Sequence, residues 1–465
     1  MDTPRNIVLL VADSLRYDAV HGAGPAAAGL PWTLAHGVTF TQARSAGCWT
    51  LPATASLFTG RFPHAHGADA QTRALPRDVP TLAERLAEVG YHPHQVTANA
   101  ATTDVFGLDR GFESVQRTWT KVPVRHTFFD PAFVLMSKPR VRKKLLDPTY
   151  LAGQMSQDVE AARVWLQDTA SAVLDDARRI LAEEEARGHR SFLFVNVMET
   201  HFPYHVADTF ETLADTPWGA AEEIWSLFHL VNQTWLTTGK QPLTPARLSR
   251  LRDRQRRSWQ RLAARIDAFV EEMHAAGNLV VFCADHGDTF GEDDWVYHFS
   301  NVSEGGNRVP LHWVSPGIHG TGGSAPRNAP RSGGGPSIDV PVSTRDVFEG
   351  ILWEAGHPAA RFHPVVSPEE SLSVLQSVWY AHAAGTLPQY RQNQLCVVEG
   401  GARWRLREGR WARSELSDGT GAEPDWAPLD AGVDPLEEAG FLPERARALR
   451  HARDAFVDYA RTLEG

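Results

Sequence analysis

Acidic residues and histidines stand directly after apolar stretches of this sequence. Asp13 follows Arg5–Ala12 (RNIVLLVA), Glu199-Thr200-His201 follows Ser191–Met198, and Asp285-His286 follows Asn278–Ala284. Each stretch is apolar on both faces, which predicts a fully buried strand. Ligands bind beyond the carboxyl ends of the strands in an open α/β sheet, so we expect these side chains at one edge. Taken singly, Asp13 also suits the cap of a helix over 14–20, and an Asp-His pair suits an ordinary turn.

Thr50 is a candidate nucleophile in the segment Gly47–Gly67 (GCWTLPATASLFTGRFPHAHG). Pro52 suits the first turn of a helix that runs to about Thr59, and Gly60 suits its end. Thr50 then lies at the helix N-terminus, where unpaired N–H groups and the helix dipole favour an anion. A divalent cation beside the hydroxyl would activate it for attack. The alternative is that Thr50 only caps the helix.

Asp13, Thr50, Asp285 and His286 together form an oxygen-rich donor set with one imidazole nitrogen. Such a set predicts one divalent metal cation. The imidazole favours Zn or Mn, with Ca or Mg as alternatives.

The elements that must position these residues alternate between strand and helix. Helical patterns over about 81–89, 157–186 and 245–276 lie between the buried stretches, and a strand is expected near His94–Ala98 and another over Val309–Val314. Ser343 suits the cap of a helix over Thr344–Ala355. Strands separated by helices predict an α/β fold: a mostly parallel central sheet flanked by helices on both faces.

The last part of the chain departs from this rhythm. Short β segments from about Leu395 and a helix near Pro443–Leu463 predict a small C-terminal antiparallel sheet plus helix. We therefore expect a catalytic domain over 1–390 and a small α+β subdomain over 391–465 packed on it. Gly320–Gly335 predicts a mobile surface loop, and the basic stretch Ser137–Leu146 predicts a solvated face or, alternatively, a phosphate-binding segment.

Composition excludes several classes of protein. The 465 residues carry a formal charge of −10 and are 42% hydrophobic, which is ordinary for a globular enzyme and gives no support to nucleic-acid binding. An apolar run of membrane-spanning length is missing, and the N-terminus resembles a strand more than a signal peptide, so we expect no membrane anchor. Cys48, Cys283 and Cys396 are too scattered for a disulfide framework, which predicts a reducing, cytoplasmic setting.

Five ordered blocks of sequence resemble a known family. They are NIVLLVADSLRYD, CWTLPATASLFTGRFPHAHG, FVNVMETHFPY, VVFCADHGDTFGED and SEGGNRVPLHWVSPG. Their order is similar to that of the sulfatase branch of the alkaline phosphatase superfamily. Val342–Gly356 and the tail ARWRLREG…DPLEEAG fit the closing pattern of that family. The resemblance covers nearly the whole chain and is weakest over about 115–190 and in the Gly-rich loop.

The departures from that family affect the reaction expected. Sulfatases that use formylglycine carry Cys or Ser where this chain has Thr50, and threonine does not yield the required aldehyde; no formylglycine is expected. Cys48 lies two residues too early, so a structural thiol is favoured over a modified nucleophile. The paired Asp-Asp of those sulfatases is here Asp13-Ser14. The resemblance therefore implies a phosphoryl-transfer member that forms a covalent phosphothreonine.

Further residues follow from the resemblance. His201 matches a position that contacts oxygens of the transferred group, and His298 lies near the position that serves the leaving group. Arg61, Asn99 and Arg308 are weaker candidates, whereas His64 and His66 are expected to be structural.

The function expected is a metal-dependent hydrolase of a soluble small-molecule phosphate, phosphonate or phosphodiester substrate. The alternatives are hydrolysis of a sulfate ester, transfer of the group to an acceptor alcohol, and an inactive binding protein of the same fold.

Overall fold

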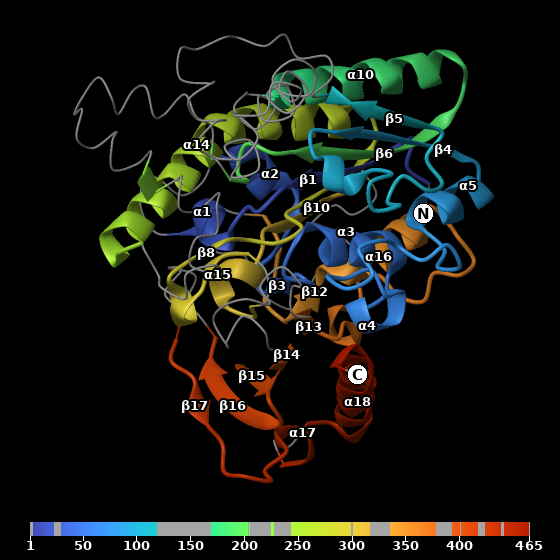
Figure 1. Ribbon diagram of the computed structural model, residues 1–465. Coiled ribbons are helices and arrows are strands. Elements are labelled where there is room, and N and C mark those ends of the chain that lie inside the picture. Colours follow the sequence, from blue (N-terminus) through green and yellow to red (C-terminus); the bar gives the residue numbers. More distant parts are fainter. Residues whose placement is uncertain are drawn as a thin grey trace, which may run out of the picture.

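The apolar stretches that precede the candidate site residues form the centre of one sheet. We analysed a computed structural model that describes residues 3–22, 29–118, 169–202, 204, 225–226, 243–298, 301–316, 335–377, 393–399, 401–416, 424–438 and 441–464. In these residues the large sheet has eight strands in the order β11-β2-β10-β7-β1-β6-β4-β5 (Figure 1). Their bounds in that order are Ser337–Ile338, Val38–Phe40, Leu311–Val314, Leu279–Cys283, Ile7–Ala12, Arg190–Val197, Tyr91–Thr97 and Ser114–Arg117.

The sheet is mostly parallel, as predicted. β1 runs parallel to both of its neighbours, β6 and β7, and β4 runs parallel to β6 and β5. β10 is the exception, because it is antiparallel to both β7 and β2. Every residue of β1 and β7 is buried, as expected for central strands covered on both faces.

Helices cover both faces of this sheet. On one face α14 (Pro245–Ala275) packs on β7, α10 (Ala170–Ala186) packs on β6 and β4, and α2 (Pro31–His36) packs against α14. On the other face α3 (Thr50–Thr59), α5 (Leu82–Glu88) and α16 (Val347–Glu354) pack against one another. Figure 1 shows the two groups on opposite sides of the sheet. The α/β class is therefore confirmed.

Local signals set most of the helix ends. Thr81 caps α5 in a reciprocal capping box with Glu84, and Gly60 ends α3 in the left-handed conformation. Ser343 caps a short 3₁₀ turn that leads into α16. The helix predicted from 157 is described only from Ala170, and the basic stretch 137–146 and most of the Gly-rich loop lie outside the described residues.

The end of the chain forms the predicted antiparallel sheet and helix. Its strands are β13 (Val374–Ser377), β14 (Gln394–Glu399), β15 (Ala402–Arg407), β16 (Arg410–Glu415) and β17 (Ala427–Pro428), followed by α17 (Pro435–Glu438) and α18 (Pro443–Glu464). Apolar residues of this sheet and of α18 pack together with Ala46 and Phe62 from the larger part. β13 already belongs to this sheet, and the division between residues 390 and 391 stays a prediction.

Shorter elements connect these layers. They are α1 (Tyr17–His21), β3 (Ala43–Arg44), α4 (Pro63–His66), β8 (Thr289–Phe290), β9 (Val296–Tyr297), α15 (Glu304–Asn307), β12 (Val342–Ser343) and the 3₁₀ turns Ala100–Thr102, Glu292–Asp294, Thr344–Asp346 and Pro368–Glu370. Among the helices of the described residues, none combines the length and the hydropathy needed to cross a bilayer.

Candidate active site

The ends of β1 and β7 bring two carboxylates and an imidazole together. Ala12 pairs with Val197 of β6, and Val11 pairs with Cys283 of β7, so Asp13 and Asp285 leave neighbouring strands at one edge. His286 Nε2 lies 3.7 Å from Asp13 Oδ1 and 3.5 Å from Asp285 Oδ2. The three side chains are completely buried, and their donor atoms lie within 4.8 Å of one another.

The N-terminus of α3 brings Thr50 to the same point. Thr50 Oγ1 lies 3.4 Å from His286 Nε2. Thr50 is the first residue of the helix and Trp49 is its N-cap, with no side-chain hydrogen bond at that cap. The hydroxyl is therefore directed to the carboxylate–histidine cluster instead of capping the helix.

Hydrogen bonds fix the orientation of each candidate ligand. Asp13 accepts from Asn99 Nδ2 at 2.6 Å and from Ser14 Oγ at 3.1 Å. Asp285 Oδ1 accepts from the backbone N–H of Ser14 and of His286. His286 Nδ1 lies 2.9 Å from the Gly287 carbonyl, so Nδ1 carries the proton and Nε2 is left for a ligand. Such outer contacts are what orient metal-binding side chains.

One buried oxygen of this cluster is left without a donor. Asp285 Oδ2 accepts no hydrogen bond from any described residue. A buried carboxylate oxygen that lacks a donor is costly, and a divalent cation beside it removes that cost. Two carboxylate oxygens, one hydroxyl and one imidazole nitrogen are donors that suit such a cation. The residues present therefore fit a divalent metal.

The electrostatics of the two acids differ. Burial and then the neighbouring Asp13 raise the pKa of Asp285 well above its ordinary value. Burial also opposes ionisation of Asp13, but His201, His286 and the amide of Asn99 outweigh it and hold the pKa of Asp13 below its ordinary value. Asp13 therefore ionises more readily than Asp285.

Two further histidines border the cluster. The His298 ring centre lies 4.6 Å from that of His286 and 5.3 Å from that of His201. His298 Nδ1 lies 2.7 Å from Asp288 Oδ1, and His201 Nδ1 lies 2.7 Å from the Phe202 carbonyl. Each ring thus has Nδ1 engaged and Nε2 as its second nitrogen. Burial, then His286 and His201, lowers the pKa of His298 well below its ordinary value, so this ring is neutral at pH 7.

Sequence reasoning missed the group that holds His298. Asp288 also accepts from the Tyr204 hydroxyl at 2.8 Å, and burial raises its pKa to about 6. Gln255 of α14 lies 3.4 Å from Asp288 and donates to the carbonyls of Ser14 and Thr200 at 3.0 Å. Asp288 stands two residues after His286 in the block ADHGD, which was the available signal.

The other named residues have different places. Asn99, ranked as a weak candidate, contacts Asp13 directly. Arg308 donates to the Thr41 carbonyl, a contact that holds its turn in place. His66 contacts Ser56, His64 contacts Gln376, and the thiol of Cys48 contacts Ser377. Glu199 caps α10 by accepting from the backbone of Thr169 and Ala170, so it lies outside the cluster.

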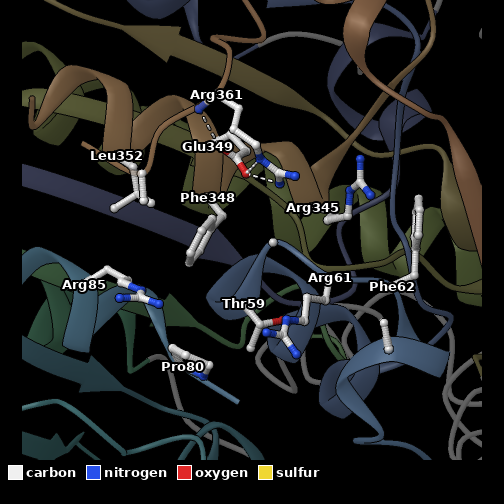
Figure 2. Close-up of a pocket in the computed structure, with 13 residues that line it drawn as sticks. Thr59, Arg61, Phe62, Pro80, Arg85, Arg345, Phe348, Glu349, Leu352 and Arg361 are labelled. Carbon is white, nitrogen blue, oxygen red and sulfur yellow. Dashed lines mark hydrogen bonds and ion pairs between the residues drawn. The ribbon is translucent and has the colours of Figure 1, made fainter. Parts of the chain in front are cut away.

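Arg61 lines a separate hollow at the far end of α3. This hollow has a volume of about 420 Å³, and Figure 2 shows Arg61, Arg85, Arg345 and Arg361 around it. A helix of ten residues is about 14 Å long, which separates Thr59 in this hollow from Thr50 in the cluster. None of the carboxylates or histidines described above lines it.

Comparison with known proteins agrees with this architecture. The chain is 21% identical to arylsulfatase K of Xenopus laevis over 458 residues, which cover 91% of this chain and 76% of that protein. It resembles the structure of the phosphonate monoester hydrolase of Agrobacterium radiobacter with a TM-score of 0.57 and 16% identity, over 98% of this chain and 96% of that one. It also resembles the structure of BT4656 bound to D-glucosamine-2-N,6-O-disulfate, with a TM-score of 0.55 and 12% identity, over 98% and 99% of the two chains.

A sequence profile of the sulfatase family matches residues 5–356, which contain every side chain of the cluster. The chain therefore belongs to the sulfatase family, a family of ester hydrolases.

Proposed function

We propose that this protein hydrolyses phosphate or phosphonate esters through a covalent phosphothreonine at Thr50. The observation that carries the proposal is the 3.4 Å approach of Thr50 Oγ1 to His286 Nε2, at the point where Asp13 and Asp285 converge. A hydroxyl at a buried helix N-terminus, beside two carboxylates and an imidazole, is placed to act as a nucleophile when a cation activates it.

Asp13, Asp285, His286 and Thr50 are the residues that would hold a divalent metal. Enzymes of this superfamily use such a metal, and the unpartnered Oδ2 of Asp285 supports its presence here. When bound, the metal supplies positive charge that stabilises the ionised Thr50 oxygen and the oxygens of the substrate. The imidazole among the ligands favours Zn or Mn over Ca or Mg.

The residues of the chain carry out the chemical steps. Thr50 Oγ1 passes its proton to an imidazole, His298 or His201, and attacks phosphorus in line, and the bond from phosphorus to the leaving oxygen breaks. The N-terminus of α3 neutralises charge on the other phosphoryl oxygens. The imidazole returns the proton to the leaving oxygen, which departs as the alcohol. Water then gives a proton to the imidazole and attacks phosphorus, and that proton passes to Thr50 Oγ1 as its bond to phosphorus breaks.

The arrangement of His298 suits the second step. Asp288 holds its Nδ1, so the neutral ring presents Nε2 as a proton acceptor for the attacking water. His201 is placed beside it with its Nε2 3.4 Å from the Tyr297 hydroxyl. Both rings are therefore placed to transfer protons on the same side of the site.

Sulfate-ester hydrolysis at the same site is the second candidate. The match to arylsulfatase K favours it, whereas Thr50 in place of a formylglycine precursor and Ser14 in place of a second acid favour the phosphoryl reaction. Parallel assays with p-nitrophenyl phosphate, bis-p-nitrophenyl phosphate, a p-nitrophenyl phosphonate and p-nitrophenyl sulfate test the two. We expect turnover of a phosphorus ester. After rapid quenching, mass spectrometry should detect a phosphorylated Thr50. Turnover of the sulfate alone would overturn the proposal.

We further propose a small, soluble substrate and a reducing, cytoplasmic setting. Within the described structure Cys48, Cys283 and Cys396 are buried and not joined by disulfides, which supports the second point. Adding acceptor alcohols to the assay distinguishes hydrolysis from group transfer, because a transferase would form a new ester.

A further inference from the structure

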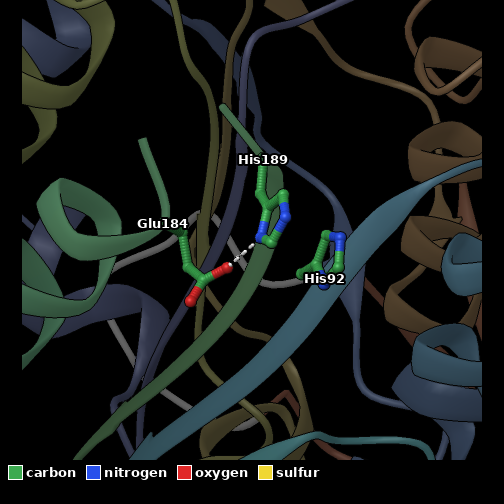
Figure 3. Close-up of side chains that lie close together, drawn as sticks. All are labelled: His92, Glu184 and His189. Carbon is green, nitrogen blue, oxygen red and sulfur yellow. Dashed lines mark hydrogen bonds and ion pairs between the residues drawn. The ribbon is translucent and has the colours of Figure 1, made fainter. Parts of the chain in front are cut away.

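A second group of histidine and carboxylate side chains lies at the opposite edge of the central sheet. His92, Glu184 and His189 offer donor atoms within 4.8 Å of one another (Figure 3). β6 starts at Arg190, directly after His189, and ends before His201. Its eight residues span about 26 Å, so this group is remote from Thr50 and its neighbours.

The fold brings these residues together through strand register and one tight turn. Tyr91 of β4 pairs with Arg190 of β6, which places His92 and His189 at the start of neighbouring strands. Gly188 adopts a left-handed φ of 76°, and the chain between α10 and β6 folds back on itself there. The backbone N–H of His189 consequently bonds to the Glu184 carbonyl, and the two side chains face each other.

The donor atoms are close to a coordinating arrangement. His189 Nδ1 lies 2.7 Å from Glu184 Oε2, and the His92 and His189 rings stack with centres 3.9 Å apart. Donors around a tetrahedral zinc lie about 3.3 Å apart, because each is about 2 Å from the metal. Glu184 and His189 are therefore already near that spacing, and the His92 ring turns out of the stack to direct its nitrogen to the ion.

Neighbouring groups complete the surroundings of this cluster. Glu113 lies 2.9 Å from His92 Nδ1, which leaves Nε2 of that ring to coordinate, as in the carboxylate–histidine pairs of metal sites. Arg187 pairs with the other carboxylate oxygen of Glu184, Oε1. That pairing leaves Oε2 as the oxygen that faces His189.

In the described structure, a buried nitrogen without a hydrogen bond also lies beside Glu184. His94 lies on the same face of β4 as His92, because it is two residues further along the strand. Its side chain is only 7% exposed, and its Nε2 lies 3.9 Å from Glu184 Oε1. Across the described part of the chain this nitrogen finds no hydrogen-bond partner. A buried polar atom left in this way indicates that the cluster is incomplete without a further group.

We propose that His92, Glu184 and His189 bind a zinc-class divalent cation, with His94 positioning the Glu184 carboxylate. Two imidazoles and one carboxylate select zinc over calcium or magnesium. The ion takes the place of the hydrogen bond between His189 Nδ1 and Glu184 Oε2, whose proton passes to water, and it connects the turn after α10 to the start of β4. This site is separate from the proposed catalytic metal and does not depend on it.

Zinc stoichiometry tests the proposal. Chelator-treated protein is dialysed against zinc and analysed for bound metal, for wild type, for His92→Gln/His189→Gln and for His451→Gln, an exposed histidine of α18. We expect the double variant to bind about one zinc ion per chain less than wild type, and the control to match wild type. Equal zinc content in the double variant and wild type would overturn the proposal, because the side chains would then be only an ion-pair network.

A second measurement needs no variant. Crystals of the wild-type protein equilibrated with zinc are expected to show anomalous density beside His189 at the zinc edge. Density at Asp285 without density at His189 overturns the second site and leaves the catalytic proposal intact. Density at His189 alone supports the second site and contradicts a zinc ion in the catalytic one.

Discussion

The two edges of the central sheet both gather histidines and carboxylates, but they hold them differently. At the carboxyl edge His286, Asp13 and Asp285 are fully buried; backbone groups orient Asp285 and His286, and the uncharged side chains of Asn99 and Ser14 orient Asp13. At the amino edge His92 is 33% and His189 is 38% exposed, and Glu113 and Arg187 hold the cluster through charged side chains. Strand register makes residues neighbours at either edge, whereas full burial and uncharged hydrogen-bond donors distinguish the carboxyl edge and suit the reaction proposed there.

Removal of the Thr50 hydroxyl should have the largest effect at the carboxyl edge. Thr50→Ala is expected to lower kcat by about 10⁴-fold or more, because the nucleophile is lost. Metal content should remain close to that of wild type. Thr50→Ser keeps a hydroxyl and should retain measurable turnover. Near-wild-type turnover of Thr50→Ala would remove Thr50 as the nucleophile.

Loss of a carboxylate ligand should come next. Asp285→Asn is expected to reduce kcat/KM by about 100-fold or more and to reduce bound metal, with partial rescue by added Zn or Mn. Steady-state assays with elemental analysis measure both quantities. Asp253→Asn, an exposed acid on α14, is the control. Full activity of wild-type protein after exhaustive chelation contradicts a metal requirement.

Asp288 should have a smaller effect that depends on the leaving group. Asp288→Asn keeps the shape but removes the charge that supports proton transfer by His298. We expect kcat/KM to fall by about 10- to 100-fold for esters of weakly acidic alcohols, and by less for p-nitrophenyl esters. A series of aryl esters measures this dependence. The same loss across the whole series would argue for a purely structural role.

The smallest change in turnover is expected for Glu199. This residue lies at the same sheet edge as the site, but its carboxylate caps the N-terminus of α10. Glu199→Gln should lower the free energy of unfolding by about 1–2 kcal/mol, since the carboxylate accepts from the N-terminus of α10. Turnover should stay within about twofold of wild type. Urea unfolding measures the first quantity, with Glu185→Gln, an exposed residue of α10, as control. A large loss of turnover without destabilisation would place Glu199 in the reaction.

The sequence predicted the parts of this molecule that depend on local patterns. Apolar runs predicted β1, β6 and β7, and Pro52 and Gly60 predicted α3 with Thr50 at its start. Because neighbouring parallel strands share an edge, the convergence of Asp13, Asp285 and His286 followed from the same patterns.

Contacts that depend on turns were not predictable in the same way. Asp288 meets His298 only because β8 and β9 form a hairpin between them, and nothing in the spacing fixed that geometry. β10 runs antiparallel to β7, and the residue pattern of a strand does not show in which direction that strand runs within the sheet. The cluster of His92 and His189 needs both strand register and the turn at Gly188, and the sequence shows no motif for it.

Gln255 connects α14 to the proposed reaction centre. One side-chain amide touches the carbonyls after β1 and β6 and the carboxylate after β7. A displacement of the helix along its axis would therefore disturb the hydrogen bonds at all three loop starts together. Through this one amide the 31-residue helix is coupled to the backbone that follows the three strands.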